Sequence, residues 1–306
     1  MVTPDDARRV TARGLGHLVI VYLVWGSTYL AIRFGVREGS GFPPFALGAV
    51  RTVAAGTLLF LWAFARGTSV RIRRSECVTL VVAGLLMWPG ANGLVNWAEQ
   101  RADSSYAALL VGAMPIWTAL IDAIWRRRLP SWRLIGFLAV GFSGIGLLTV
   151  PQLRSAEGAD SMSILMLILA PITWSIGTLL QIHRPVRVSP VVASAYLNLF
   201  GGLGFAVLWV AAGEPFPHPT PEAWGALAYL AVAGSVVAYT AYVRTLRMLP
   251  TSIAMTYAYV NPMVAVLLGW ALLRERITLT TVFGMVVILI GVWGVFREKR
   301  RVLRAA

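Results

Sequence analysis

The sequence predicts an all-α integral membrane protein with ten transmembrane helices, arranged as two inverted five-helix repeats. Three observations predict this class. Hydrophobic residues make up 58% of the 306 residues and charged residues only 13%, about half the charged share of a soluble domain. Apolar segments of about 20 residues alternate with short polar connectors. The two halves of the chain also share the positions of a proline, a glycine and two tryptophans.

Ten apolar segments are long enough to cross a membrane as helices. We expect them, in order, at 15–36, 45–65, 77–98, 104–125, 131–150, 162–182, 190–212, 222–243, 251–273 and 278–296. Clusters of proline, glycine and charge separate them, as in GSGFPP, RRRLPS and GEPFPHPTPE. No connector is long enough for a separate domain. The polar start of the chain and the length of its first apolar segment argue against a cleavable signal peptide.

The distribution of basic residues favours an even number of spans. Ten spans place both termini on one side, and 20 of the 27 Lys and Arg residues fall on that side, whereas six fall on the other. Cytoplasmic loops are enriched in Lys and Arg, so we expect both termini in the cytoplasm. The net charge of +14 is then a topology signal that favours contact with the lipid bilayer, and no nucleic-acid partner is expected.

An internal repeat relates the two halves. Pro115 and Pro262 lie 147 positions apart, and a nearby offset of 149 relates Trp25 to Trp174. Because five spans is an odd number, the second copy enters the membrane from the opposite side. Inverted repeats of this kind are typical of alternating-access transporters. A duplication that only enlarges a helix bundle is the alternative.

Three stretches resemble the drug/metabolite transporter superfamily, namely VYLVWGSTYLAIRFGV, SYAALLVGAMPIWTAL and TYAYVNPMVAVLLGWALLRE. More narrowly, the chain looks like EamA-type permeases of the YedA-like subgroup along essentially its whole length. The resemblance implies two EamA repeats, which we expect at 1–152 and 153–306, in a bacterial inner membrane. It also implies the export of small metabolites such as amino acids or toxic compounds.

Aromatic and polar residues away from the span ends are the candidate substrate-binding residues, because this architecture places its site near the midplane. Polar side chains at that depth are costly and often functional. The candidates are Trp25, Ser27, Asn92, Asn96, Trp174, Tyr239, Tyr257 and Asn261. They predict an aromatic-walled cavity for an amphipathic small-molecule substrate. Lipid-facing aromatic side chains and hydrogen bonds between helices are the alternatives.

Three charged residues are candidates for coupling or charge pairing. Arg51 either holds a substrate carboxylate or an acidic residue such as Asp122, or extends to the outer interface. Asp122 and Glu99 are candidate proton carriers, and a salt bridge to the arginines that follow it is the alternative for Asp122. Glu99 also continues a polar stripe with Asn92 and Asn96 on one face of the third span.

Two prolines are candidate hinges. Pro115 and Pro262 each remove a backbone donor within a span, which produces either a hinge or a static kink. Asn261 precedes Pro262 and is expected to cap backbone that the proline loosens. Glycines in the fifth and tenth spans predict close helix packing, either as a scaffold or as the contact of a homodimer.

Enzymatic sequence motifs are absent, including GxSxG, HExxH and the Walker A motif. The single cysteine, Cys77, excludes an intramolecular disulfide, and no catalytic residue, metal site or cofactor is expected. The leading hypothesis is therefore a secondary-active permease. A facilitated uniporter is the alternative within transport, and a membrane-embedded receptor or lipid-modifying enzyme is the remote one.

Overall fold

The computed structural model describes residues 10–36, 39–98, 109–155, 161–273 and 277–305. Within these ranges the chain is helical apart from short connectors, and it contains no strand. In this described part, nine helical stretches are long and apolar enough to cross a membrane, and Trp132–Leu147 forms a shorter apolar helix. These stretches correspond to the ten predicted spans, which confirms the fold class.

Each span is one helix or a series of consecutive helical segments. In chain order the segments are α1 (Ala12–Val36), α2 (Pro44–Ala65), α3 (Arg74–Met87), η1 (Trp88–Gly93), α4 (Leu94–Ala98), α6 (Met114–Arg126), α7 (Trp132–Ser155), α8 (Ser161–His183), α9 (Pro190–Ala211), α10 (Pro221–Tyr229), η2 (Leu230–Ala238), α11 (Tyr239–Met248), α12 (Thr251–Ala254), α13 (Tyr257–Leu273) and α14 (Leu279–Ala305). The segments η1 and η2 are π-helical. The third span is therefore α3–η1–α4, and the eighth is α10–η2–α11.

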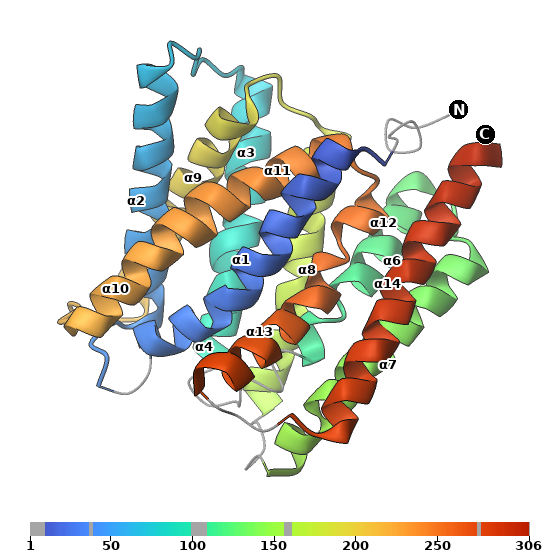
Figure 1. The fold of residues 1–306 in the computed structure, drawn as a ribbon. Coiled ribbons are helices and arrows are strands. Elements are labelled where there is room, and N and C mark those ends of the chain that lie inside the picture. The colour runs from blue at the N-terminus through green and yellow to red at the C-terminus, as the bar shows by residue number, and fades with distance from the viewer. Residues whose placement is uncertain (1–9, 37–38, 99–108, 156–160, 274–276, 306) are drawn as a thin grey trace.

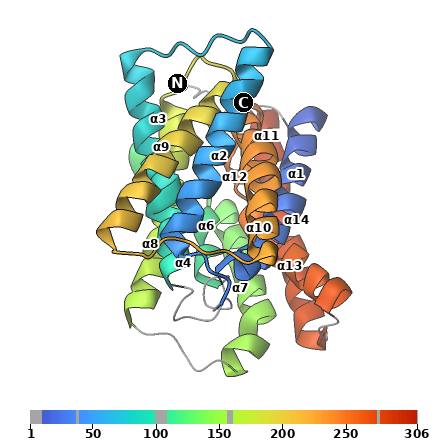
Figure 2. The same ribbon diagram turned by 90° about the vertical axis from the view of Figure 1, so that its left-hand side faces the viewer.

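The start of α1 and the end of α14 lie at the same end of the bundle, as Figures 1 and 2 show. The connectors between α2 and α3 and between α8 and α9 lie at that end too, which we call the terminal end. The opposite end is the far end. The first and last helices thus agree with an even number of spans, whereas the cytoplasmic orientation of the terminal end stays a prediction.

Large apolar side chains cover the outside of the bundle. Those of Leu61 and Phe64 on α2, Val207 and Val210 on α9, and Phe283 on α14 are all more than half exposed. Monomeric soluble proteins rarely expose apolar surface on this scale. A bilayer solvates such side chains, so these positions face lipid.

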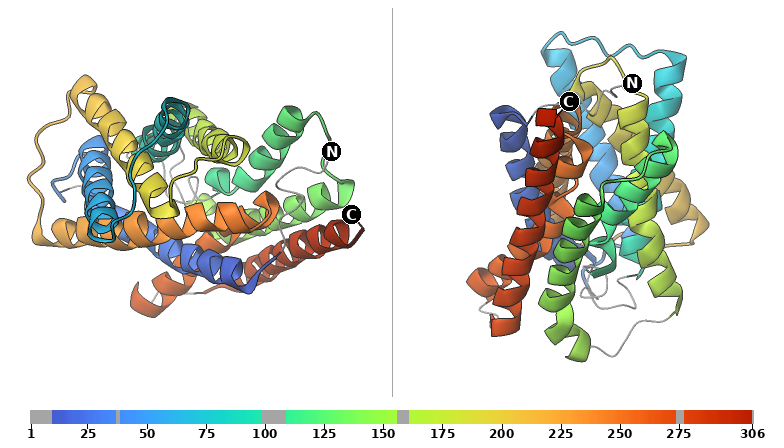
Figure 3. Two further views of the ribbon diagram at one scale, coloured as in Figure 1. Left: turned by 90° about the horizontal axis from the view of Figure 1, so that it is seen from above. Right: turned by 90° about the vertical axis from the view of Figure 1, so that its right-hand side faces the viewer.

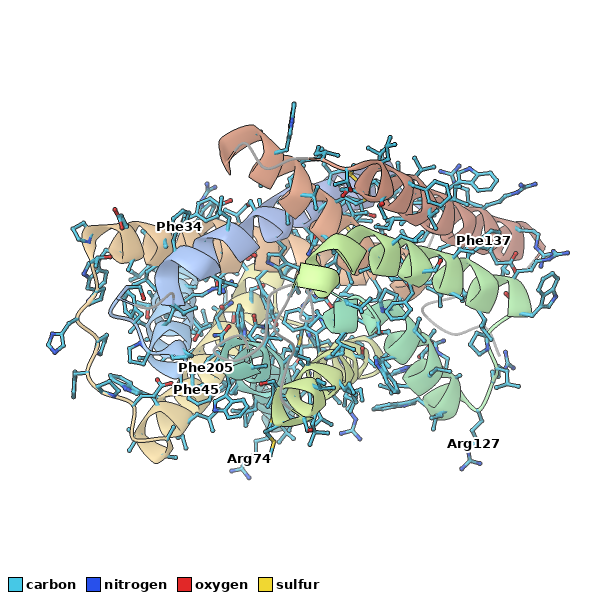
Figure 4. All side chains as sticks on the ribbon, turned by 90° about the horizontal axis from the view of Figure 1, so that it is seen from below. Phe34, Phe45, Arg74, Arg127, Phe137 and Phe205 are labelled. Carbon is cyan, nitrogen blue, oxygen red and sulfur yellow. The ribbon has the colours of Figure 1, made fainter. Side chains whose placement is uncertain are left out.

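Glycines bring α7 and α14, the fifth and tenth spans, into close contact on one side of the bundle (Figure 3). A Cβ added at Gly291 on α14 would lie 2.5 Å from the backbone Cα of Gly141 on α7. The ring of Phe137, labelled in Figure 4, occupies the space beside Gly294. These glycines are thus used within one chain, which fits the scaffold interpretation of the two spans.

The second and seventh spans, α2 and α9, also pack across glycines. A Cβ at Gly202 on α9 would lie 3.0 Å from the backbone nitrogen of Val53 on α2, and the ring of Phe205 lies against Gly48. Figure 4 labels Phe205 at this side of the bundle. Helices that occupy the same position in the two halves therefore pack against each other. Such pairs are expected when two inverted repeats are related by a pseudo-two-fold axis.

A carboxylate from the connector between α9 and α10 holds the start of α2. Glu214 accepts hydrogen bonds from the backbone nitrogen of Phe45, at 3.0 and 3.1 Å, and from that of Ala46, at 3.0 Å. The first N–H groups of a helix lack intrahelical partners and carry partial positive charge. The ionised carboxylate therefore stabilises this helix end and ties the connector to it.

We expect Glu214→Gln to lower the free energy of unfolding by about 1 kcal/mol, because the neutral amide offers one acceptor oxygen and no charge. The measurement is the Tm of the full chain in detergent micelles. Glu214→Asp keeps the charge and should lose less. Equal Tm values for the wild type and Glu214→Gln would contradict the capping role.

Candidate functional site

A cavity of about 100 Å³ lies inside the bundle, and we call it the central cavity. Its walls come from both halves of the chain, chiefly from α1, α2, η1, α4, α8 and α13. It brings together most of the residues that the sequence predicts as a site, namely Trp25, Arg51, Asn92, Asn96, Trp174, Tyr257 and Asn261. The predicted residues are thus neighbours in space, although they lie on six different segments.

Aromatic rings form one wall of the central cavity. The centroid of the Trp25 ring lies 5.5 Å from that of Trp174 and 5.0 Å from those of Tyr242 and Tyr257. The indole Nε1 of Trp25 donates to the carbonyl oxygen of Gly234 at 3.0 Å. The contacts with Trp174 and Tyr257 are edge-to-face, whereas that with Tyr242 is tilted, and edge-to-face contacts hold rings in preferred orientations. The repeat-related Trp25 and Trp174 therefore meet in a rigid wall.

Arg51 turns its side chain into the bundle. It lies seven residues from Pro44 on α2, about 10 Å from the far end at the helical rise per residue. Its Nε donates to Ser235 Oγ at 2.8 Å, and its guanidinium carbon lies 5.1 Å from the centroid of the Trp88 ring. The residue is only 7% exposed. The structure therefore differs from the alternative in which Arg51 extends to the outer interface.

The two π-helical segments position the groups around Arg51. Trp88 begins η1, and Ser235 lies within η2. These two residues are 147 positions apart, which is the offset of the internal repeat. Wide π-helical turns are rare and occur frequently at functional sites. Each half of the chain thus contributes one irregular segment to the same site.

Side chains donate hydrogen bonds to backbone carbonyls within and beside η1. Pro89 removes one N–H from this segment. The Asn92 amide nitrogen donates to the Met87 carbonyl oxygen at 3.0 Å, and Thr173 Oγ1 donates to the Gly90 carbonyl oxygen at 2.7 Å. Irregular backbone in a membrane is tolerated when such partners exist. Asn92 is therefore a structural partner of η1 as well as a cavity residue.

The other two amides of the central cavity differ in their partners. Asn96 donates from Nδ2 to the carbonyl oxygen of Pro44 at 3.4 Å. Asn261 is 3% exposed, and its Oδ1 has no hydrogen-bond partner among the residues that the structure describes. Proline frees a backbone carbonyl, which only the donor Nδ2 of Asn261 could satisfy, so the cap near Pro262 stays a prediction, and the side chain lines the cavity. A buried acceptor without a partner is a group that a ligand can satisfy.

Ser27 does not line the central cavity. Its Oγ lies 2.5 Å from the hydroxyl of Tyr229, on another face of α1. Two residues turn a helix by about 200°, so Ser27 points away from Trp25. Thr28, three residues beyond Trp25, does line the cavity, as residues three apart share a helix face. That spacing is the sequence signal that favours Thr28 over Ser27.

Tyr239 also lies outside the cavity lining. Its ring packs behind the wall, with its centroid 5.1 Å from that of Trp88. Sequence reasoning missed Trp88 and Tyr242, because an aromatic residue in an apolar span also fits a lipid-facing position. Pro89, which follows Trp88, was the sequence feature that could have pointed to Trp88.

Glu99 lies outside the described residues.

A second cleft, of about 330 Å³, lies near the terminal end and is bordered by α6, α7, α12 and α14. We call it the terminal cleft. Asp122 lines it and accepts a hydrogen bond from Arg126 Nε at 2.7 Å. His183 Nε2 lies 2.8 Å from the same carboxylate oxygen. Asp122 is therefore paired locally, as the salt-bridge alternative expects, and it is not the partner of Arg51.

The central cavity and the terminal cleft are separated at residues that lie only one or two positions apart in the sequence. Met114 lines the cavity and Pro115 the cleft, while Tyr257 lines the cavity and Met255 the cleft. The hydroxyl of Tyr257 donates to Met114 Sδ at 2.9 Å. The helical path is interrupted on both sides of this contact, by turns at 112–113 and 255–256. The barrier between the two hollows thus consists of side chains beside two helix breaks.

The two candidate hinge prolines sit differently relative to these breaks. Pro115 lies in the first turn of α6, directly after the turn at 112–113. Pro262 lies inside α13, beyond the turn at 255–256. At that turn Thr256 Oγ1 donates to the Ile253 carbonyl oxygen at 2.6 Å. The second break is therefore stabilised by a threonine and precedes the proline.

Comparisons with known proteins relate the whole chain to membrane transporters. Residues 12–150 and 161–297 match the description of the EamA-like transporter family. A protein of Escherichia coli strain K12, named uncharacterized inner membrane transporter YedA, is 32% identical over 267 residues, which cover 86% of this chain and 84% of that one. The uncharacterized transporter YoaV of Bacillus subtilis is 21% identical, over 90% and 94% of the two chains. A solved crystal structure of another protein has the same fold, with a TM-score of 0.80 at 18% identity over 95% of this chain and 99% of that one.

Proposed function

The chain belongs to the EamA-like transporter family, and on that premise we propose that it is a secondary-active permease for small amphipathic metabolites. Family and relatives indicate a multi-pass transport protein of the inner membrane rather than an enzyme. We further propose that it exports its substrate, with the terminal end in the cytoplasm and with residues 1–152 and 153–306 as its two repeats.

One observation carries this proposal: the central cavity and the terminal cleft lie on either side of a barrier that adjoins two helix breaks. Helix breaks near a site between inverted repeats allow one part of a helix to tilt while the other stays packed. Separation of Tyr257 from Met114 would join the cavity to the cleft. Alternating access then needs movement only around 112–113 and 255–256, while the glycine-packed pairs α7–α14 and α2–α9 stay fixed.

The experiment is a comparison of cells that overproduce the full chain with cells that carry the empty vector. Metabolites that accumulate outside the first cells identify export substrates. The purified chain in proteoliposomes then tests the mechanism with the radiolabelled form of an identified metabolite. No difference between the two cell lines and no flux in proteoliposomes would contradict the permease. Flux that equalises but never concentrates the metabolite would favour the facilitated uniporter.

Proton coupling is part of the proposal and rests on Asp122. This carboxylate lines the terminal cleft between Arg126 and His183, where water can reach it. An imposed pH gradient should accelerate export by the wild type, and Asp122→Asn should remove that acceleration. Flux that ignores the gradient would contradict the coupling and leave the transport proposal standing.

We expect Asn261→Ala to lower transport by about tenfold, because it removes a buried polar group from the cavity wall, an effect of about 1.4 kcal/mol. Asn198→Ala is a matched control. Asn198 is also fully buried, and its Oδ1 has no partner within the described ranges, but it is not among the residues that line the central cavity. The measurement is initial flux per folded protein in proteoliposomes. Equal losses in the two variants would refute a substrate contact at Asn261.

A further inference from the structure

The charge balance of the central cavity is unusual. Arg51 is 7% exposed and lines the cavity, and arginine stays protonated in proteins. Among the residues that the structure describes, no carboxylate pairs with it, since Asp122 is bound to Arg126 and His183. An isolated positive charge at this depth in a membrane protein is costly. The site therefore favours the entry of an anion.

The guanidinium is held in place but is not saturated. Only its Nε has a hydrogen-bond partner, Ser235 Oγ, in the described part of the chain. The Trp88 ring supports one face of the guanidinium at 5.1 Å, and the absence of a side chain at Gly234 leaves room for Nη2, which a Cβ there would approach to 3.0 Å. The terminal N–H groups thus remain to bind a planar anion. A carboxylate matches that fork through two parallel hydrogen bonds.

The other residues that line the cavity indicate which kind of group the rest of the ligand carries. Trp25, Trp174 and Tyr257 present rings to the cavity, and these suit an apolar or aromatic group. Asn261 Oδ1 is also buried at this cavity and has no partner in the described part of the chain; as an acceptor it would bind a hydrogen-bond donor on the body of the ligand, not the carboxylate group. Structural amides elsewhere in this cavity have partners in the protein, as Asn92 and Asn96 do.

We propose that the central cavity binds small organic carboxylates with an apolar body, and that Arg51 is the residue that binds the carboxylate group. This inference rests on the proposed function, because it names the substrate class of the same cavity. The guanidinium donates to both carboxylate oxygens, Ser235 fixes its Nε, and the aromatic wall holds the apolar body. Neutral analogues of the same shape lose the charge-assisted hydrogen bonds.

The test compares phenylacetate with phenylacetamide, which share an apolar body and differ in charge. Binding to the purified full chain in detergent is measured from the ligand concentration that gives half-maximal thermal stabilisation. We expect the wild type to bind phenylacetate about tenfold or more tightly than phenylacetamide. Arg51→Gln should bring this ratio close to one by weakening only the acid. Arg51→Lys keeps the charge without the fork and should retain part of the preference.

Arg66→Gln is the control for the loss of one positive charge, because Arg66 is the C-cap residue of α2, remote from the cavity lining. It should keep the wild-type ratio. A ratio near one in the wild type would overturn the proposal, as would an acid preference that survives Arg51→Gln or a failure of the wild type to bind either compound. If a carboxylate of the protein itself paired with Arg51, the wild type would give a ratio near one. If flux of a neutral or cationic metabolite were then measured, the permease function would still be supported and only the carboxylate substrate class would be refuted.

Discussion

Leucine in place of Gly291 is expected to prevent stable folding of the chain. A Cβ at this position on α14 would lie 2.5 Å from both the Cα and the backbone nitrogen of Gly141 on α7. Backbone atoms cannot move aside as a flexible side chain can, so α14 must shift away from α7. Overpacking in a well-packed interior costs about 1–3 kcal/mol and sometimes more, and the separation of two long helices places this case at or above the upper end. The measurement is the yield of monodisperse protein in size-exclusion chromatography and its Tm.

The same helix pair offers a matched control. Gly136 lies on α7, and an added Cβ there meets no atom within 4 Å. Gly136→Leu should therefore give a yield and Tm close to those of the wild type. Both variants add the same side chain to a membrane helix, so hydrophobicity is held constant. Equal stability of the two variants would show that the α7–α14 contact is not required for the fold.

The sequence predicted the spans well because apolar length is a strong signal in a membrane protein. The expected segments 45–65 and 190–212 correspond to Pro44–Ala65 and Pro190–Ala211. Hydropathy, however, carries no information on which backbone N–H and C=O groups pair in a helix. It therefore could not indicate that 88–93 and 230–238 are π-helical, or that the break before α13 falls at 255–256.

The lining of the central cavity was predicted in part, and the residues placed wrongly share one physical reason. Hydropathy and repeat offsets locate a residue along a helix, but they do not establish which way it faces. Ser27 lies beside the correct depth and points elsewhere, whereas Thr28 shares the face of Trp25. The inward turn of Arg51 depends on Ser235 and Trp88, which belong to other spans. Such contacts between spans were not available from local sequence patterns.

Removal of the Trp25 side chain is expected to lower transport strongly. In Trp25→Ala the cavity loses a ring that contacts those of Trp174, Tyr242 and Tyr257, and the Gly234 carbonyl loses its donor. Truncation of a buried Trp costs about 3–5 kcal/mol of stability, so flux must be compared per folded protein. We expect a loss of at least about tenfold in that quantity, because the cavity wall that would hold an apolar ligand no longer exists.

Two further variants separate a transport effect from a folding effect. Trp293 on α14 is 56% exposed, so Trp293→Ala should transport at the wild-type rate. Trp174→Ala should resemble Trp25→Ala, because the two rings meet at 5.5 Å in one wall. The double variant should then lose much less than the product of the two single losses, as expected for residues in contact. Multiplicative losses would show that the two tryptophans act at separate places, and the shared aromatic wall would be refuted.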